Sequence, residues 1–172
     1  MLKNYDNIFL DRDGIINEVI IRGTEVSSPR NFNEFKFRSE IREFVKELHN
    51  QRKRIFIVSN QPDIARGKLS KKDLGDMTKL IKKELKITEI SYCTHDDKDG
   101  CNCRKPQPGL ITNYIKKYKL SESKSVMIGD SIKDMKAAQN AGIKSILLKT
   151  EHNKSIKNSI EYVHIFQLLE LL

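Results

Sequence analysis

The sequence predicts an α/β protein with a Rossmann-like, open, mostly parallel sheet flanked by helices. Short β-branched runs alternate with longer stretches of helical period, a pattern typical of βαβ units. The chain has 172 residues, the length of one ordinary domain, so we expect a single domain over 1–172. The expected strands are Asn7–Asp11, Arg54–Ser59, Glu89–Thr94, Ser125–Asp130, Lys144–Lys149 and Glu161–Ile165.

Helices are expected between these strands because apolar residues recur there at helical spacing. The apolar faces comprise Ile41, Phe44, Val45 and Leu48; Leu74, Met77, Ile81 and Leu85; and Leu110, Ile111, Tyr114, Ile115 and Tyr118. Ser70 is the expected cap of the second helix, and a fourth runs from Ile132 until Gly142 stops it. The irregular stretch 17–37 leaves room for a loop or small flap, so we expect no separate cap domain.

The composition indicates an anionic ligand and no membrane span. Lysine and arginine exceed aspartate and glutamate by 32 to 23, a net charge of +9. The lysines are scattered along helix faces without a block of five or six, so we expect no nucleic-acid partner. No apolar run approaches the roughly 20 residues of a membrane span. Asp6, Asp11 and Asp13 stand where a signal peptide needs an apolar stretch, and we expect a cytoplasmic monomer.

Polar residues follow several predicted strands at the point where each strand ends. The first strand ends in Asp11 and is followed by Asp13, the second ends in Ser59 and Asn60, and the fourth ends in Asp130. Ligands of open α/β sheets bind at this carboxyl edge. Each residue alone could be an ordinary turn or cap residue. Carboxylates gathered together repel one another unless a cation lies among them, and oxygen ligands suit Mg²⁺.

These motifs, in this order, resemble those of the haloacid dehalogenase superfamily. Motif one is IFLDRDGIIN, motif two is FIVSNQ, motif three is the lysine of CRKPQPG, and motif four is MIGDSIKD. The similarity runs from Ile8 to Lys149. The chain is similar to the small, capless phosphatases of this superfamily, which include heptose bisphosphate phosphatases and the histidinol phosphatase domain.

The resemblance implies a phosphatase that uses an aspartyl-phosphate intermediate. Asp11 would be the nucleophile, and Asp13 would be the general acid and then the general base. Mg²⁺ would be bound by Asp11, by the backbone carbonyl of Asp13 and by Asp130. Ser59 and Lys105 would hold the phosphoryl oxygens. Asp134 is expected to orient Lys105 or a metal-bound water.

The three cysteines and one histidine of CTHDDKDGCNC form a candidate zinc site. Cys93, His95, Cys101 and Cys103 offer three thiolates and an imidazole, the ligands that tetrahedral Zn²⁺ prefers. A disulfide or unrelated thiols are the alternatives, but an odd number of cysteines in an intracellular chain disfavours disulfides. Four protein ligands close the coordination sphere, so the zinc would be structural. The related phosphatases carry a similar loop, which here would position the adjacent Arg104 and Lys105.

The loops around the site are expected to recognise the substrate. The candidate substrate-binding residues are Arg12, Asn17, Asn60, Gln61, Arg104 and Ser131. The DRDGIIN and IARGK segments most resemble the D-glycero-D-manno-heptose 1,7-bisphosphate 7-phosphatases. Two positions depart from that pattern. Pro62-Asp63 stands where the family usually carries small residues, and Ser131 stands where lysine often follows the motif-four aspartate. A bisphosphate needs a second anion site, for which Arg12, Arg22, Arg30, Arg66 and Arg104 are available.

Other readings stay open. A histidinol-phosphate phosphatase would bind a cationic amine and favour an acidic loop, whereas this loop has Glu18, Glu25 and Glu34 beside Arg22 and Arg30. A polynucleotide 3′-phosphatase would suit the positive charge, but those enzymes usually lack this zinc loop. A non-enzymatic zinc module on a degenerate phosphatase fold would lack a catalytic residue, and none of the four motifs is missing one.

Overall fold

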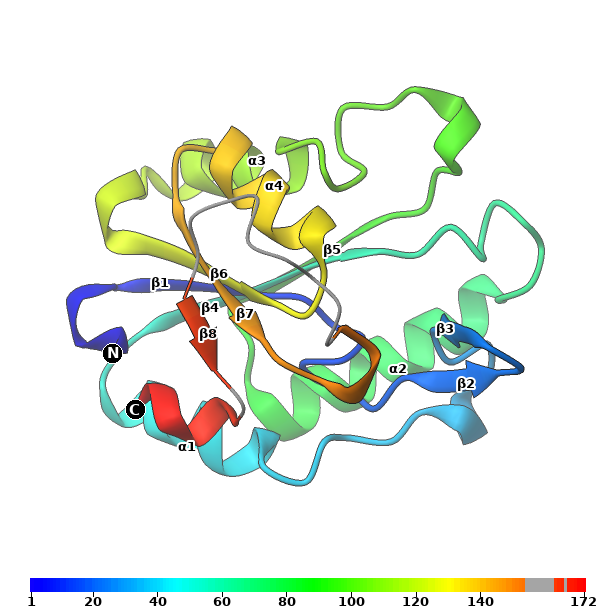
Figure 1. Ribbon diagram of the computed structural model, residues 1–172, viewed down its shortest axis with the longest axis horizontal. Coiled ribbons are helices and arrows are strands. Elements are labelled where there is room, and N and C mark those ends of the chain that lie inside the picture. The colour runs from blue at the N-terminus through cyan, green and yellow to red at the C-terminus, as the bar shows by residue number, and fades with distance from the viewer. Residues whose placement is uncertain (154–162, 166) are drawn as a thin grey trace.

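Six parallel strands form one open sheet in the part of the chain that the structure describes, residues 1–153, 163–165 and 167–172 of a computed structural model. The spatial order is β5-β4-β1-β6-β7-β8 (Figure 1). The strands are β1 Asn7–Leu10, β4 Arg54–Asn60, β5 Glu89–Cys93, β6 Ser125–Gly129, β7 Lys144–Leu148 and β8 Val163–Ile165. The predicted α/β class with an open parallel sheet is confirmed, and the sheet order places β1 between two parallel neighbours.

The strand ends differ slightly from the sequence prediction. β1, β5, β6 and β7 each end one residue earlier than predicted, and β4 ends one residue later, at Asn60. Asp11 and Asp130 therefore lie just beyond the strands, where the chain turns away from the sheet. Of the last predicted strand, Glu161 and Tyr162 lie outside the described residues.

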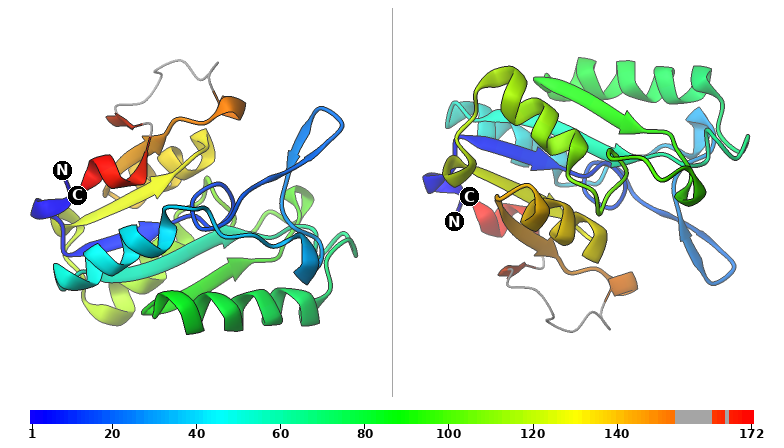
Figure 2. Two further views of the ribbon diagram at one scale, coloured as in Figure 1. Left: turned by 90° about the horizontal axis from the view of Figure 1, so that it is seen from below. Right: turned by 90° about the horizontal axis from the view of Figure 1, so that it is seen from above.

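Helices cover both faces of the sheet (Figures 1 and 2). The α-helices are α1 Ile41–Asn50, α2 Lys71–Leu85, α3 Gly109–Tyr118 and α4 Ile132–Asn140. The short 3₁₀ helices are η1 Leu2–Asn4, η2 Phe32–Glu34, η3 Asp97–Asp99, η4 Glu122–Lys124, η5 Glu151–Asn153 and η6 Leu168–Leu171. Ser70 caps α2 by accepting a hydrogen bond from the Asp73 backbone N–H, as predicted.

Alternate side chains of the central strands enter two separate cores. Ile8 and Leu10 of β1 pack with α1 and α2 on one face, whereas Phe9 packs with α3 and α4 on the other. This alternation follows from the two-residue period of a strand. Because both faces are covered, the central strands are apolar throughout, and the polar residues that could carry function are restricted to the strand ends.

A small antiparallel hairpin occupies the irregular stretch after β1. It consists of β2 Ile20–Arg22 and β3 Glu25–Ser27, which pair only with each other among the described residues. Figure 2 shows it projecting beyond the carboxyl edge of the main sheet. The stretch 17–37 therefore forms a small flap, as predicted, and contains only this hairpin and one short 3₁₀ helix. None of the described helices is long and apolar enough to cross a membrane.

Candidate active site

A cavity of about 430 Å³ lies at the carboxyl edge of the sheet. Its floor contains Asp11, Asp13, Ser59, Lys105, Asp130 and Asp134. Parallel register explains this convergence, since Leu10 of β1 lies beside Ile57 of β4 and Ile128 of β6, so the residues that follow all three strands emerge together. Residues predicted from four separate motifs thus line one cavity.

Lys105 is the cation that pairs with the carboxylates of the cavity floor. Its Nζ lies 2.8 Å from Asp11 Oδ1 and 2.5 Å from Asp134 Oδ1, and it donates to the Val58 carbonyl at 2.9 Å. Burial disfavours the charged amine, but Asp11 and Asp134 outweigh burial and raise the pKa of Lys105. Asp134 therefore lies beside Lys105, the first of the two placements expected from the sequence.

The floor carries more carboxylates than Lys105 can neutralise. Oxygen atoms of Asp11, Asp130 and Asp134 all lie within 4.8 Å of one another. Burial, together with Asp134 and Asp13, raises the pKa of Asp11 to about 6 against the opposing effect of Lys105. Burial and the neighbouring Asp134 and Asp11 raise the pKa of Asp130 well above its usual range. Such clustered, partly uncompensated oxygens fit a hard divalent cation.

A glycine permits the close approach of Asp130 to the loop after β1. Gly14 has φ +85°, and a Cβ at this position would lie 1.9 Å from Asp130 Oδ2. The backbone of Asp130 is fixed from the other side, because Asn153 Nδ2 donates to its carbonyl at 2.7 Å and to the Leu148 carbonyl at 2.8 Å. Asp130 is thus held between the loop that contains Gly14 and the segment that contains Asn153.

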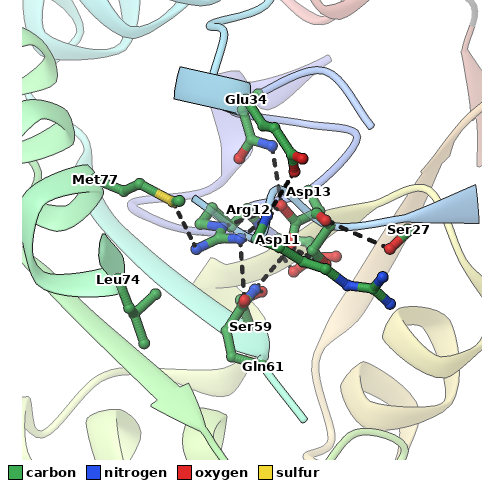
Figure 3. Close-up of polar contacts among 12 residues, drawn as sticks. Asp11, Arg12, Asp13, Ser27, Glu34, Ser59, Gln61, Leu74 and Met77 are labelled. Carbon is green, nitrogen blue, oxygen red and sulfur yellow. Dashed lines mark hydrogen bonds and ion pairs between the residues drawn. The ribbon is translucent and has the colours of Figure 1, made fainter. Parts of the chain in front are cut away.

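The carboxylate of Asp13 accepts hydrogen bonds from several side chains (Figure 3). Asn17 Nδ2 and Ser28 Oγ each donate to it at 2.9 Å, Gln61 Nε2 donates at 2.7 Å, and Arg12 donates from Nε and Nη2. Burial opposes ionisation, but Arg12 and these hydrogen bonds outweigh it and lower the pKa of Asp13.

Arg12 and Asn17 lie beneath the cavity rather than along it. Both are completely buried. The Arg12 guanidinium points toward Met77 Sδ at 3.9 Å and Gln61 Oε1 at 3.0 Å, as Figure 3 shows. The sequence interpretation gave both residues a substrate contact. The structure instead places them behind Asp13, because Gln61 and Asp13 offer Arg12 buried acceptors on the side away from the opening.

The residues at the end of β4 connect Asp13 to Lys105. Gln61 Nε2 also donates to Ser59 Oγ at 3.1 Å, so Ser59 and Asp13 both accept hydrogen bonds from the Gln61 amide nitrogen. Asn60 bonds the backbone of Lys105 through both ends of its amide, from Nδ2 to the Lys105 carbonyl and to Oδ1 from the Lys105 N–H. Ser59, Asn60 and Gln61 all line the cavity, and the side chain of Asn60 bonds the Lys105 backbone instead of pointing freely into the opening.

Ser131 begins α4 beside Asp130. Its hydroxyl donates to Asp134 Oδ2 at 2.6 Å and caps the helix, while the Asp134 carboxylate accepts from the Ser131 backbone N–H in a reciprocal capping box. Ser131 lines the cavity as expected, but its hydroxyl is already engaged with the carboxylate that pairs with Lys105.

Cys93, His95, Cys101 and Cys103 form a compact cluster beside the cavity. The sulfur atoms lie 3.2–3.6 Å from one another, and His95 Nδ1 lies 3.5 Å from Cys93 Sγ and 3.3 Å from Cys103 Sγ. A tetrahedron with Zn–S bonds near 2.3 Å has edges of about 3.8 Å, so the donors are spaced as four ligands of one ion. All three cysteines are free thiols, which contradicts the disulfide alternative in this structure.

The thiols of the cluster differ in acidity. Burial and the neighbouring Cys93 and Cys101 sulfurs raise the pKa of Cys103 to about 12. Burial acts in the same direction on Cys101, but backbone N–H groups of Cys103 and Arg104 outweigh it and lower the pKa of Cys101 to about 7. A metal would relieve this crowding of sulfur atoms because thiolates are its preferred ligands.

The outer wall of the cavity is rich in cations. Of the five arginines considered for a second anion, Arg30, Arg66 and Arg104 line the cavity, whereas Arg12 and Arg22 do not. Lys68 and Lys133 also line it. The carboxylates of the outer wall are Glu25, Asp63 and Asp97. No individual role was expected for Ser28, Asp63, Asp97 or Lys133 from the sequence, because their contacts in the cavity wall depend on the folded chain.

Comparison with known proteins agrees with this geometry. The model of the haloacid dehalogenase-like hydrolase family matches residues 10–148, which contain motif one from Leu10 onward and all of motifs two, three and four. The chain therefore belongs to the haloacid dehalogenase-like hydrolases.

Particular relatives are similar over nearly their whole length. A D-glycero-β-D-manno-heptose-1,7-bisphosphate 7-phosphatase of Helicobacter pylori J99 is 34% identical, over 95% of this chain and 99% of the relative. A D-glycero-α-D-manno-heptose-1,7-bisphosphate 7-phosphatase of Campylobacter jejuni is 30% identical, over 93% of this chain and 95% of the relative. Enzymes named for both anomers thus occur among the relatives.

A solved structure shares the fold. The D,D-heptose 1,7-bisphosphate phosphatase of B. bronchiseptica, complexed with magnesium and phosphate, superimposes with a TM-score of 0.83 at 23% identity. The match covers 96% of this chain and 95% of that one. The agreement over both chains confirms the Rossmann-like fold.

Proposed function

We propose that this protein is a Mg²⁺-dependent phosphatase that removes the 7-phosphate of D-glycero-D-manno-heptose 1,7-bisphosphate. The single observation that carries the choice of substrate is the charge of the outer cavity wall. Five cationic side chains and three carboxylates line it beyond the catalytic floor. A second phosphate is attracted to such a wall, whereas the amine of histidinol phosphate is not. The names of the relatives described above support the same substrate.

Asp11 is the proposed nucleophile. Its carboxylate oxygen would attack phosphorus while the bond from phosphorus to the sugar oxygen breaks, leaving an aspartyl phosphate. Water would then attack the phosphorus and release inorganic phosphate and free Asp11. The contact of Asp11 with Lys105 and its place on the cavity floor support this role. Ser59 and Lys105 would hold the phosphoryl oxygens through both steps.

Asp13 is the proposed proton donor and acceptor. It would protonate the departing sugar oxygen in the first step and accept a proton from the attacking water in the second. The protonated form needed first is favoured when the hydrogen bonds from Arg12 and Gln61 are released, because burial alone raises the pKa of a carboxyl group. Arg12 and Asn17 would therefore position Asp13 and hold it ionised between turnovers.

Asp11, Asp130 and the backbone carbonyl of Asp13 are the proposed ligands of Mg²⁺. The close carboxylates of Asp11 and Asp130, with the pKa of each raised, support this assignment. When bound, the ion would offset the repulsion between carboxylate and phosphate. Asp134 would hold Lys105 and leave the metal to the other two carboxylates, since its Oδ1 lies against the lysine amine.

The Cys₃His cluster is the proposed site of a structural Zn²⁺. Three thiols and an imidazole at tetrahedral spacing support zinc over magnesium, which prefers oxygen. Cys93 ends β5 directly opposite Asn60 of β4, and its carbonyl accepts from the Gln61 N–H at 2.7 Å. Through Asn60, the zinc loop would fix the backbone of Lys105 on one side, and through Arg104 it would present a cation to the sugar.

Phosphate release from a panel of substrates tests the proposal. The panel contains both anomers of heptose 1,7-bisphosphate, histidinol phosphate and a 3′-phosphorylated oligonucleotide, each with Mg²⁺. We expect kcat/KM to be highest for a heptose bisphosphate. A higher value with histidinol phosphate would contradict the substrate, and a higher value with the oligonucleotide would establish the 3′-phosphatase alternative. A cytoplasmic location and a monomeric state stay predictions from the sequence.

A further inference from the structure

Asp97 lies in the outer wall of the cavity with both carboxylate oxygens turned toward arginines. Arg104 Nε donates to Oδ1 at 2.7 Å, and Arg66 Nη2 donates to Oδ2 at 3.3 Å. The side chain of Arg104 is only 11% exposed, whereas that of Asp97 is 67% exposed. The arginine is thus fixed in the wall, and its carboxylate partner stands at the solvent side.

The two arginines come from different loops and are held by other contacts as well. Arg66 binds Asp96 through Nε at 3.0 Å and Nη2 at 2.5 Å, and its Nη1 lies 3.7 Å from Asp63. Arg104 Nη1 also donates to the His95 carbonyl at 3.3 Å. Neither guanidinium depends on Asp97 alone for its position, so both can remain in place when Asp97 moves away.

Lys133, from the first turn of α4, faces the same cavity. Its side chain has no ion-pair partner among the described residues. Three cations from three separate segments, Arg66, Arg104 and Lys133, therefore line the wall around the exposed carboxylate of Asp97. An oxyanion of another molecule satisfies such a group by the same charge-assisted hydrogen bonds that Asp97 makes.

We infer that Arg66, Arg104 and Lys133 form a second anion site at the cavity mouth, and that Asp97 occupies this site in the free protein as a displaceable counter-ion. The ligand would be a phosphate monoester on a sugar whose other phosphate reaches Asp11. This inference rests on the proposed function for the identity of the ligand. Asp97 would weaken binding of ligands with one phosphate and favour the substrate with two phosphates, whose second phosphate replaces the Asp97 carboxylate in the site.

Binding of a hexose 1-phosphate tests the site without catalysis. Mannose 1-phosphate is titrated calorimetrically into the full-length protein in buffer without Mg²⁺ and without chelator, so that the carboxylates of the floor repel phosphate while the zinc loop is kept. Asp97→Asn should tighten binding about two- to fivefold, the size expected for loss of an exposed ion pair. Lys133→Gln should weaken it by a similar factor. Weaker binding by Asp97→Asn would overturn the inference, since Asp97 would then position Arg104.

Turnover supplies the second measurement. For Asp97→Asn, the ratio of kcat/KM on the heptose bisphosphate to kcat/KM on p-nitrophenyl phosphate should rise about two- to fivefold, mainly through KM. Asp76→Asn is the matched control, because Asp76 pairs with Lys72 and Lys79 on α2 and does not line the cavity. Its ratio should equal that of the wild type.

The two measurements separate this inference from the proposed function. Normal turnover of the bisphosphate with no effect of Asp97→Asn on either binding or the ratio would overturn the counter-ion role and leave the proposed substrate standing. Absence of bisphosphate turnover, together with tighter mannose 1-phosphate binding by Asp97→Asn, would remove the proposed substrate and support the anion site alone.

Discussion

The side chain of Asn60 spans both backbone polar groups of Lys105. Nδ2 donates to the Lys105 carbonyl at 2.9 Å, and Oδ1 accepts from the Lys105 N–H at 3.0 Å. The two residues lie 45 positions apart in the chain, and this amide joins the end of β4 to the loop that follows the Cys₃His cluster. The placement of the lysine amine on the cavity floor therefore depends on a residue that does not touch the amine.

Replacing Asn60 should impair catalysis without removing any charged group. In Asn60→Ala the Lys105 backbone loses both bonds, and a displacement of about 1 Å at a catalytic group can lower kcat on the order of 10²-fold. Steady-state phosphate release, with zinc content measured on the same samples, checks this. Asn50→Ala is the control, since Asn50 bonds Glu47 on the surface of α1. Wild-type kcat in Asn60→Ala would show that Lys105 is placed by its side-chain contacts alone.

Loss of the nucleophile should abolish turnover while the fold persists. Asp11→Asn keeps the size of the side chain but removes both its nucleophilicity and its negative charge, so phosphate release should fall to background with an unchanged circular dichroism spectrum. Asp13→Asn should lower kcat by about 10²- to 10⁴-fold, the range that proton transfer commonly supplies. Asp6→Asn, exposed before β1, should behave as the wild type. Substantial turnover by Asp11→Asn would rule out an aspartyl phosphate.

A methyl group at position 14 should displace Asp130. The Cβ of Gly14→Ala would lie 1.9 Å from Asp130 Oδ2, so the apparent Mg²⁺ affinity measured from activity should fall along with kcat. Gly23→Ala separates this clash from backbone strain, because Gly23 has φ +63° with no atom within 4 Å of the added Cβ. Equal Mg²⁺ dependence in the two variants would mean that strain, and not the approach of Asp130, explains the loss.

Removing one thiolate should release the zinc and reduce activity indirectly. In Cys103→Ser we expect less than one zinc per chain by mass spectrometry, and a lower kcat because the loop no longer fixes Arg104 and Lys105. Acidification should likewise release zinc from the wild type, since protons compete for the thiolates. His49→Gln, outside the cluster, should retain zinc. Full zinc content in Cys103→Ser would exclude that ligand, and a zinc-free wild type with full activity would exclude the positioning role.

The strands and helices could be predicted because their signals are local. Ile8, Phe9 and Leu10 are apolar without interruption, as a strand covered on both faces requires, and Ser70 stands at the start of α2. The β2–β3 hairpin was expected only as a small flap. Its strands have three residues each and pair only with each other among the described residues, so their local pattern is too short to predict strands.

The direction of individual side chains could not be predicted from neighbouring residues. Arg12 lies between Asp11 and Asp13 in the sequence, yet its side chain turns beneath Asp13 because Gln61 and Met77, 49 and 65 positions away, offer buried contacts there. Asp97 meets Arg66 across 31 positions. Motifs thus located the cavity floor, whereas the positioning residues behind it and the ion pairs of its wall are set by the folded chain.

The ammonium group of Lys105 has three hydrogens, and three oxygen atoms already lie within 2.9 Å of its nitrogen, from Val58, Asp11 and Asp134. A phosphoryl oxygen can therefore be received only by exchange of one partner. In the proposed mechanism Asp11 is the partner that leaves the amine, since its oxygen would turn to phosphorus as the new bond forms. The arriving phosphate would then accept the hydrogen bond that Lys105 donated to Asp11. The amine would therefore keep three acceptors throughout turnover.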